Sequence, residues 1–347
     1  MKLLENVLYK NDIKYITSLD LPWNKIENKT ILISGASGMI GSCMIDALMS
    51  KDINIKVIAL GRNEEKAKER FNEYWNSHNF TFVECDINEP IKEIGNVDFV
   101  VHAASNTHPR QYSLDPIGTV TTNIIGTNNL LNYAAYHEVE RFMFASSVEV
   151  YGENRGDTEK FNENYCGYID CNSLRAGYPE SKRAGEALCQ AFIKQKGLDI
   201  VIPRLSRTYG PTMLMSDSKA IAQFIKKGVA KEDIVLKSEG TQFYSYSYVV
   251  DAVTALLTIL LKGECGEAYN IADDNSDIAL RDLAKIIAEF VEKKVIFELP
   301  DETESAGYSK ATKAILDSTK LQALGWKSKY DIESGLRRTV DILGAVK

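Results

Sequence analysis

The sequence predicts an α/β fold, with a Rossmann-type doubly wound parallel sheet followed by a smaller mixed α/β domain. From residue 30 to residue 205, short β-branched runs alternate with helical patterns. Parallel neighbouring strands need a crossover between them, and this alternation supplies it. After Tyr209-Gly210-Pro211 the alternation fades and scattered apolar helices replace it. We therefore expect one large sheet with helices on both faces, and a separate smaller unit.

The expected elements follow in order along the chain. Residues 1–29 mix polar and apolar side chains and end near Pro22 and Trp23, which predicts a helical or irregular extension. Strands are expected at 30–34, 56–60, 80–84, 99–103, 142–146 and 200–205, and helices from 39, over 64–75, over 252–261 and over 280–291. This order divides the chain into the extension 1–29, a doubly wound domain of 30–205 with a return at about 241–272, and a second domain of 206–240 and 273–347.

The composition is that of a globular protein with about two domains, because the chain has 347 residues and a domain has roughly 150. Hydrophobic residues make up 44% and charged residues 26%, so the chain can bury a sizeable core. The net charge is −7 and no Lys/Arg-rich run is present. A phosphate backbone would be repelled more than attracted. We therefore expect no nucleic-acid partner.

Neither a membrane span nor a metal site is expected. The longest apolar run, 252–261, is far shorter than the ~20 residues that cross a bilayer. The first residues hold no apolar block of the kind that a secretory signal has. These two observations predict a cytoplasmic protein. The six cysteines form no CxxC pair and only four histidines are present, so no metal-ligand spacing is recognisable.

A glycine-rich loop lies between the first predicted strand and the helix after it. Three glycines recur there at a three-residue spacing. The first permits a tight turn, the second lets the backbone approach a pyrophosphate, and the third permits close helix packing. The N–H groups of the helix N-terminus attract the anion. A plain surface turn is the alternative, but the strand and helix around the loop favour a dinucleotide site. Its residues are Gly35, Ser37, Gly38, Met39, Ile40 and Gly41.

The residue that usually distinguishes NAD from NADP is missing. An acidic residue about 20 positions after the loop normally holds the adenosine ribose, but the second strand ends in Gly61-Arg62-Asn63. In one interpretation Arg62 stacks on adenine or pairs with a 2′-phosphate, which favours NADP; in the other it is a solvated loop residue. The other residues expected at the cofactor follow the third and fourth strands: Asp86, Ile87, Ala103, Ala104 and Ser105.

Tyr178 and Lys182 form the only Tyr-x-x-x-Lys pair in the chain, although it has 17 tyrosines. Residues four apart share one helix face. A phenol with a pKa of about 10 is a poor base at neutral pH, but an adjacent ammonium and an oxidised nicotinamide favour its phenolate. Ser146 and Ser147 end a predicted strand, where a hydroxyl can hydrogen-bond the reacting oxygen. A chance spacing on a surface helix is the weaker alternative.

Together, the motifs resemble the extended short-chain dehydrogenase/reductases that modify nucleotide sugars, the NAD-dependent epimerase/dehydratase family. The resemblance covers nearly the whole chain from residue 30. The matching segments are Gly35-x-x-Gly38-x-x-Gly41, Asp86-Ile87, His102-Ala103-Ala104-Ser105, Asn123-Ile124-Ile125-Gly126-Thr127, Ser147-Val148-Glu149-Val150-Tyr151-Gly152, Tyr178-x-x-x-Lys182, Pro203-Arg204 and Tyr209-Gly210-Pro211.

The resemblance implies a catalytic trio of Ser147, Tyr178 and Lys182. It implies that Asn123 supports the helix and a water near Lys182, and that Arg204 belongs to the cofactor site. It also implies that the second domain holds a sugar nucleotide.

The family retains a nicotinamide cofactor. Many residues are similar to the NAD-retaining branch of the family, whereas only Arg62 favours NADP. NAD is therefore expected and NADP is the alternative. Members of the family usually dimerise through two helices per subunit. The corresponding segments here are about 118–136 and 178–196, and we expect a homodimer.

Residues 148 and 149 distinguish the branches of the family. Dehydratases of the dTDP-glucose type usually show Thr-Asp-Glu before Val-Tyr-Gly, UDP-glucuronate decarboxylases show Thr-Ser-Glu, and 4-epimerases generally lack the glutamate. This chain has Ser147-Val148-Glu149. Glu149 is the glutamate that the resemblance associates with reactions beyond C4 of the sugar. Val148 cannot donate a proton to a departing hydroxide. Other segments are most similar to the decarboxylases, among them 172–178 before the catalytic tyrosine.

The anionic groups of a sugar nucleotide need cationic partners. The family commonly places a phosphate-clamping arginine where Tyr244 stands, and the late arginine expected near 314–317 is missing. In place of these arginines, three cations are available for a pyrophosphate: Arg207, Lys219 and Arg281. Arg175 is available for a substrate carboxylate. Solvated surface is the alternative for each. The residues expected at the substrate are Ser105, Arg175, Arg207, Lys219 and Tyr244.

The leading hypothesis is a nucleotide-sugar lyase. Tyr178 takes the proton of the sugar 4-hydroxyl while C4 passes hydride to the nicotinamide, and the C4 ketone then acidifies the C5 hydrogen. Glu149 acts next at C5 or C6, in decarboxylation or dehydration. A 4-epimerase, in which the ketone takes hydride back on its other face, is the alternative. A non-catalytic NAD(P)-sensing protein is a third possibility, which the intact Tyr–Lys pair disfavours.

Overall fold

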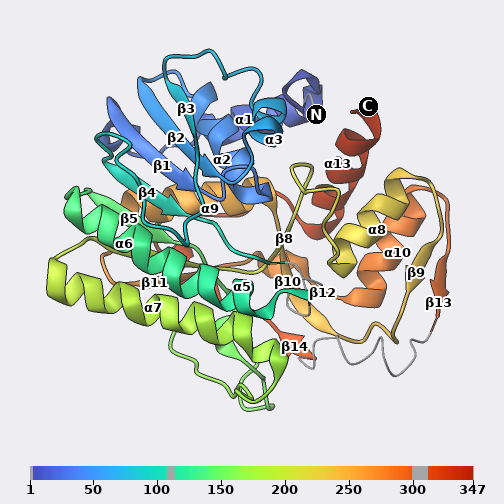
Figure 1. The fold of residues 1–347 in the computed structure, drawn as a ribbon. Helices are drawn as coiled ribbons and strands as arrows, with labels where there is room; N and C mark the ends of the chain where they lie inside the picture. The colour runs from blue at the N-terminus through green and yellow to red at the C-terminus, as the bar shows by residue number, and fades with distance from the viewer. Residues whose placement is uncertain (1–2, 108–113, 299–311, 347) are drawn as a thin grey trace.

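The computed structural model describes residues 3–107, 114–298 and 312–346. Within these ranges the main sheet has eight strands in the order β11-β7-β5-β4-β1-β2-β3, with β6 beside β7, and its pairings are parallel. Helices pack on both faces (Figure 1), so the predicted doubly wound sheet is confirmed. The strands are β1 (Lys29–Ser34), β2 (Ile55–Gly61), β3 (Phe80–Glu84), β4 (Phe99–His102), β5 (Arg141–Phe144), β6 (Ser146–Ser147), β7 (Ile200–Leu205) and β11 (Ala268–Ile271).

Alternate side chains of the central strands enter two apolar cores. Ile31 and Ile33 of β1 belong to the larger core, whereas Leu32 belongs to the other, as the two-residue period of a strand requires. One group of helices covers each face. Residues of α2 (Met39–Ser50) and α9 (Val249–Lys262) enter the larger core, and residues of α6 (Thr127–Tyr136) and α7 (Gly177–Lys196) enter the other, with α5 (Pro116–Thr121) beside α7.

The helix predicted over 64–75 is shorter than expected. It forms α3 (Glu64–Arg70), which Asn63 caps by accepting a hydrogen bond from the Lys66 N–H. The next aromatic side chains, Phe71, Tyr74 and Trp75, all pack against Phe80 of β3, with ring centroids 5.2–6.2 Å apart. Burial of these rings outweighs the continuation of the helix, because aromatic side chains bury a large area.

The second part of the chain forms two smaller sheets. β10 is central in the larger of them and pairs with β8, β12 and β14, while β9 pairs with β13. The start of the predicted return at 241–272 therefore belongs to this smaller sheet, and the chain rejoins the main sheet through α9 and β11. The elements are β8 (Arg207–Tyr209), α8 (Ala220–Val229), β9 (Ile234–Leu236), β10 (Phe243–Tyr248), β12 (Asp277–Ala279), α10 (Leu280–Phe290), β13 (Val295–Phe297), β14 (Lys313–Ala314), α12 (Thr319–Gln322) and α13 (Ile332–Ala345).

The N-terminal extension is built into the core. Its main element, α1 (Val7–Thr17), is capped by Asn6, whose side chain accepts from the N–H groups of Leu8 and Tyr9. The Tyr9 hydroxyl donates to Asp46 of α2 at 2.6 Å. The fully buried Asp12 accepts hydrogen bonds from Arg338 of α13 and from two tyrosine hydroxyls, one of them at the end of β10. α1 thus connects the glycine-loop helix to the smaller sheet.

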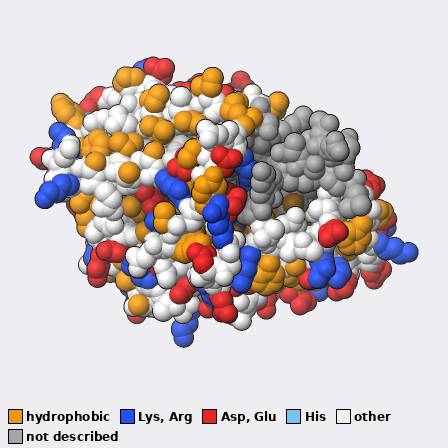
Figure 2. Space-filling model, turned by 90° about the horizontal axis from the view of Figure 1, so that it is seen from below, with side chains coloured by type: hydrophobic (Ala, Val, Ile, Leu, Met, Phe, Trp, Pro, Cys, Tyr) orange, Lys and Arg blue, Asp and Glu red, His pale blue; other side chains and the backbone are white. Residues whose placement is uncertain are grey.

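The described surface carries mixed charge. On the face seen in Figure 2, Lys and Arg side chains are interspersed with Asp and Glu, without the continuous basic stripe that tracks a phosphate backbone. In the described ranges, no helix combines the length and the apolar character needed to cross a bilayer. The same ranges contain no group of three or more His, Cys, Asp or Glu side chains that could hold a metal ion.

Replacing Asp12 with alanine is expected to destabilise the fold by about 3–5 kcal/mol, because the half-buried Arg338 would lose its carboxylate and two buried tyrosine hydroxyls would lose their acceptor. The Arg338 guanidinium nitrogens now lie 2.7 and 3.1 Å from Asp12. Urea unfolding measures the change. The matched control is Asp20→Ala, at an exposed position just after α1, which should change stability by less than about 0.5 kcal/mol. Equal effects of the two substitutions would contradict the role of α1 as a buried connection.

Candidate active site

The glycine loop connects β1 to α2 and touches the end of β4. Gly35 has a φ of +70°, and a Cβ there would lie 2.7 Å from backbone atoms of Ala103 and Ala104. A Cβ on Gly41 would lie 2.4 Å from the Gly35 carbonyl oxygen. Only glycine allows both approaches. The loop that the sequence predicts is therefore a tight turn pressed against the backbone of Ala103 and Ala104.

The start of α2 is suited to an anion. Gly38 is the N-cap and supplies no side-chain hydrogen bond, so the first N–H groups of the helix stay available, with the partial positive charge of its N-terminus. Met39 and Ile40 line the large cavity described below. His102, at the end of β4, is buried between Ser34 and Thr127, and its pKa is lowered to about 3 by burial and by the Lys182 charge. It is a neutral, structural histidine.

The residues predicted at the adenine end lie after β2 and β3. Arg62 is exposed, directly after the last residue of β2. The Asp86 carboxylate accepts from the backbone N–H and the side-chain amide of Asn88, both at 3.0 Å. Ile87 is buried against Gly126. The carboxyl ends of parallel strands in such a sheet meet where dinucleotides bind.

Tyr178 is buried at the start of α7, facing two serine hydroxyls. The pKa of Tyr178 is raised to about 12, chiefly by burial and also by the nearby Glu149 charge, against hydrogen bonds with Ser147 and Ser105 that lower it. The sequence predicts that the Lys182 ammonium and an oxidised nicotinamide favour the phenolate. In the structure the Lys182 Nζ donates to the Ala145 carbonyl oxygen at 2.8 Å. The two hydroxyls, from β6 and from the loop after β4, surround the Tyr178 phenol.

A polar network holds this part of α7 in place. Asn123, fully buried in the π-helical turn η3 (Thr122–Gly126), accepts from the Ser105 hydroxyl at 2.7 Å and donates to the Ser181 hydroxyl at 2.9 Å. Ser181 in turn donates to the Tyr178 carbonyl oxygen. Ser105 thus contacts both Asn123 and the reactive phenol. The predicted support of the helix by Asn123 takes this form in the structure.

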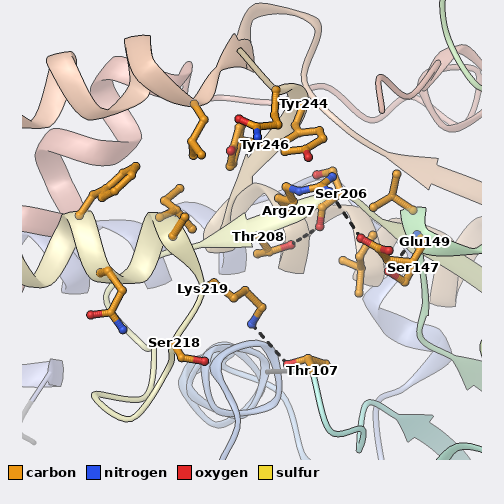
Figure 3. A pocket seen from close by; sticks show the side chains of 18 of the residues that line it. Thr107, Ser147, Glu149, Ser206, Arg207, Thr208, Ser218, Lys219, Tyr244 and Tyr246 are labelled. Atoms are coloured by element: carbon orange, nitrogen blue, oxygen red, sulfur yellow. Dashed lines mark hydrogen bonds and ion pairs between the residues drawn. The ribbon is translucent and has the colours of Figure 1, made fainter. Parts of the chain in front are cut away.

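A cavity of about 650 Å³ lies between the two parts of the molecule, and the reactive residues line one end of it. There, the Glu149 carboxylate lies between two guanidinium groups. Oε1 is 3.4 Å from Arg207 Nη2 and Oε2 is 3.7 Å from Arg175 Nη2. The Arg207 guanidinium also stacks on the Tyr244 ring, 3.4 Å from its centroid. Figure 3 shows Arg207 reaching from beside Tyr244 toward Glu149 and Ser147.

Lys219 lies at the N-cap of α8 and reaches toward the loop after β4. Its Nζ is 3.0 Å from Asp217 and 3.4 Å from the Thr107 hydroxyl (Figure 3). Of the residues predicted for the substrate, Arg175, Arg207, Lys219 and Tyr244 line the cavity. Ser105 is at its edge, through its hydrogen bond with Tyr178.

Two predicted arginines lie elsewhere. Arg204 does not line the cavity; its guanidinium is paired with Glu186 at 2.6 and 2.9 Å and also donates to Tyr151 and to the Glu163 carbonyl oxygen. Arg281 contacts Asp282 on the exposed side of α10. Glu186 is a residue that the motifs did not single out; it also accepts from Ser146, and its charge opposes the lowering of the Lys182 pKa by burial. The four-residue spacing of 178, 182 and 186 along one helix face was the available signal.

The model of the NAD dependent epimerase/dehydratase family matches residues 31–272. The chain belongs to this family. Its cofactor is accordingly NAD, and the uncapped helix N-terminus and the close approach of the glycine loop to the backbone of Ala103 and Ala104 fit a pyrophosphate. Two curated relatives, UDP-glucuronic acid decarboxylase 1 of Danio rerio and UDP-glucuronic acid decarboxylase 5 of Arabidopsis thaliana, are each 30% identical. The alignments cover 90% and 89% of this chain and 72% and 87% of those proteins.

Solved structures of the family share the fold. A UDP-glucose 4-epimerase from Thermotoga maritima is 26% identical with a TM-score of 0.79, over 90% of this chain and 98% of that one. A dTDP-glucose 4,6-dehydratase from Bacillus anthracis, solved in complex with NAD, is 22% identical with a TM-score of 0.77, over 90% and 96%. The second likeness is one of fold alone.

Burial makes the charged form of Lys182 unfavourable, which leads to a testable pH dependence. Burial lowers the pKa of Lys182 to about 8, whereas an unfolded lysine titrates near ~10.4. Between these values the unfolded chain binds more protons, so this residue makes stability rise with pH from about 8 upward. Lys182→Met is expected to lose that rise and to abolish turnover. The rise in stability is measured as the melting temperature between pH 7 and 9.5, and the contribution of Lys182 is the difference between the wild type and Lys182→Met.

The control for this substitution is Lys194→Met, at an exposed position on the same helix, which should keep the wild-type pH dependence. A Lys182→Met protein whose melting temperature follows pH as the wild type does would show that Lys182 is not buried in its charged form.

Proposed function

We propose that this protein oxidises the C4 hydroxyl of a nucleotide-linked sugar and then acts at C5 or C6, with decarboxylation of a uronic acid as the reaction. The observation that carries the proposal is the position of Glu149 in the same cavity as Tyr178 and Ser147. A reaction confined to C4 does not need that carboxylate. The names of the curated relatives, UDP-glucuronic acid decarboxylases, support the same choice.

The first step depends on Tyr178 and the serine hydroxyls. NAD, when bound, accepts the hydride from C4 and returns it at the end of the cycle. Tyr178 accepts the proton of the 4-hydroxyl, and the hydrogen bonds from Ser147 and Ser105 that lower its pKa favour the phenolate. Ser147 also stabilises the charge that develops on the sugar O4. Lys182, held by Ala145, keeps a positive charge beneath the site.

The second step follows from the ketone. A C6 carboxylate is then β to a carbonyl group, so the C5–C6 bond breaks, carbon dioxide leaves and the electron pair remains on C5 and O4. A proton must next reach C5. Glu149 positions the sugar for this step or shuttles that proton, because it lies on the cavity wall near enough to Tyr178 to raise the pKa of the phenol.

Dehydration and 4-epimerisation are the alternatives. Val148, buried beside Glu149, has no proton for a departing hydroxide, which disfavours a 4,6-dehydratase. The similarity to a UDP-glucose 4-epimerase at 26% identity keeps epimerisation as the second candidate. An epimerase leaves the sugar's mass unchanged, so the two classes differ in a directly measurable product.

The proposal predicts that UDP-glucuronic acid, incubated with the NAD-loaded protein, loses carbon dioxide, and that Glu149→Gln slows this loss by about 100-fold or more. Mass spectrometry of the nucleotide-sugar products measures both. The matched control is Glu153→Gln, a few residues later and outside the residues that line the cavity, which should keep most of the rate. A product of unchanged mass, formed equally fast by Glu149→Gln, would move the assignment to an epimerase.

We further propose a homodimer through the helices at 118–136 and 178–196. Three apolar side chains near the first of these segments are exposed in the single chain, Ile117, Ile125 and Tyr136, and burial in an interface would remove them from water. Sedimentation velocity is expected to give a dimer for the wild type and a monomer for Ile125→Glu. A monomeric wild type would contradict this assembly.

A further inference from the structure

The position of Arg207 in the smaller sheet directs its side chain across the cavity wall. Arg207 begins β8, where its backbone partner in β10 is Tyr246. Its guanidinium lies flat on the Tyr244 ring, two residues earlier in β10, at 3.4 Å from the centroid. Stacking on an aromatic face fixes the plane of an arginine side chain. Arg207 therefore presents a fork of N–H groups in a fixed plane next to Glu149.

The hydrogen-bonding capacity of this fork is only partly used. Nη2 is 3.4 Å from Glu149 Oε1, longer than the 2.7–2.9 Å typical of a charge-assisted bond. Nη1 is buried and has no hydrogen-bond partner among the described residues. A buried donor without an acceptor is costly. The site is therefore arranged for an acceptor that a ligand brings.

The local charge balance favours an anion. Glu149 is shared by Arg207 and by Arg175, 3.7 Å away, so two cations face one carboxylate. The neighbouring Lys219 is already paired with Asp217 at 3.0 Å. One positive charge in the Arg175, Glu149 and Arg207 cluster thus remains for a ligand.

The position of the cluster indicates which part of a nucleotide sugar brings that anion. Glu149 is close enough to Tyr178 for its charge to raise the pKa of the phenol, so Arg207 lies one side chain from the group that removes the C4 proton. The cavity continues away from it along α8 and β9, where Lys227 and Lys237 lie. A diphosphate belongs toward that second end, because the sugar ring separates it from the reacting carbons.

We propose that Arg207 binds the C6 carboxylate of the sugar, that Arg175 assists it from the opposite side of Glu149, and that Tyr244 is a positioning residue that holds the Arg207 plane. This inference rests on the proposed function and names the residue that makes a uronic acid the preferred substrate. A neutral sugar offers Nη1 no carboxylate. The site then leaves the buried Nη1 donor without an acceptor, and selectivity follows from that penalty.

The test compares three probes by calorimetric titration of the NAD-loaded protein carrying Tyr178→Phe, which cannot take the C4 hydroxyl proton and so does not consume the substrate: UDP-glucuronic acid, UDP-glucose and UDP. Every variant below is made in this background. Arg207→Met is expected to weaken binding of UDP-glucuronic acid roughly 10- to 100-fold, the value of one or two hydrogen bonds to a charged group. Binding of UDP-glucose and of UDP should change by less than about 3-fold. Arg207→Lys, which keeps the charge and loses the fork, should retain part of the affinity for UDP-glucuronic acid.

The matched control is Arg337→Met, which removes an exposed arginine stacked on the Phe290 ring, 4.1 Å from its centroid, away from the cavity. All three affinities should stay at the level of the Tyr178→Phe protein. The melting temperature and the NAD binding of Arg207→Met show whether this variant folds. If it does not fold, Arg207→Lys tests the proposal: a partial loss of affinity for UDP-glucuronic acid alone supports it, and an unchanged affinity overturns it.

Three results would overturn the proposal in distinguishable ways. Equal weakening of all three probes would assign Arg207 to the diphosphate. Unchanged affinity for UDP-glucuronic acid, in a protein that still releases carbon dioxide when Tyr178 is intact, would remove the role of Arg207 and leave the proposed function intact. A Tyr178→Phe protein with Arg207 intact that does not prefer UDP-glucuronic acid to UDP-glucose would contradict the proposed function itself.

Discussion

The active end of the cavity depends on burying charged side chains beneath α7. Lys182 and Glu186 belong to this helix, and Arg204 belongs to β7. Glu186 is the carboxylate that offsets both cations: it pairs with Arg204 at 2.6 Å and opposes the burial-driven fall of the Lys182 pKa. Removing ions from water is costly unless their partners are well placed. Because Glu186 also accepts from Ser146, the same ion pair fixes the strand end that carries Ser147. The Ser147 hydroxyl is thus positioned by an ionic network whose charged members, Lys182, Glu186 and Arg204, do not line the cavity.

The cavity needs both halves of the molecule. Tyr178 and Glu149 come from the main sheet and its crossover, whereas Arg207 and Tyr244 come from the paired strands β8 and β10 of the smaller sheet. The buried Asp12 of α1 bonds the last tyrosine of β10 and the C-terminal helix, and Tyr9 of the same helix bonds α2. The N-terminal extension therefore holds the helix after the glycine loop in place relative to the strands that carry Arg207 and Tyr244 at the cavity wall.

The local patterns were sufficient for the fold and for bringing Tyr178 and Lys182 onto one helix, because both depend on spacings along the chain. The βαβ alternation and the glycine loop are examples, and so is the four-residue step from Tyr178 to Lys182. What the sequence did not reveal depends on contacts between distant segments. The stacking of Arg207 on Tyr244 follows from a strand register, Glu186 was recognisable only once Arg204 and Ser146 were near it, and α3 ends early because Phe71 and Trp75 pack on Phe80. The sequence pattern left the role of residues 1–29 open. The structure shows that Asp12 in this extension bonds Tyr248 of β10 and Arg338 of α13, which are far away in the sequence.

The proposed chemistry extends beyond C4 to C5. It can be tested by running the reaction of UDP-glucuronic acid in deuterium oxide and locating deuterium in the product by nuclear magnetic resonance. A nucleotide-linked pentose with one deuterium at C5 is expected, because the electron pair left by carbon dioxide must take a proton from an exchangeable group. A six-carbon product inverted at C4, with no deuterium at C5, would show that the ketone only takes its hydride back and that no chemistry occurs at C5.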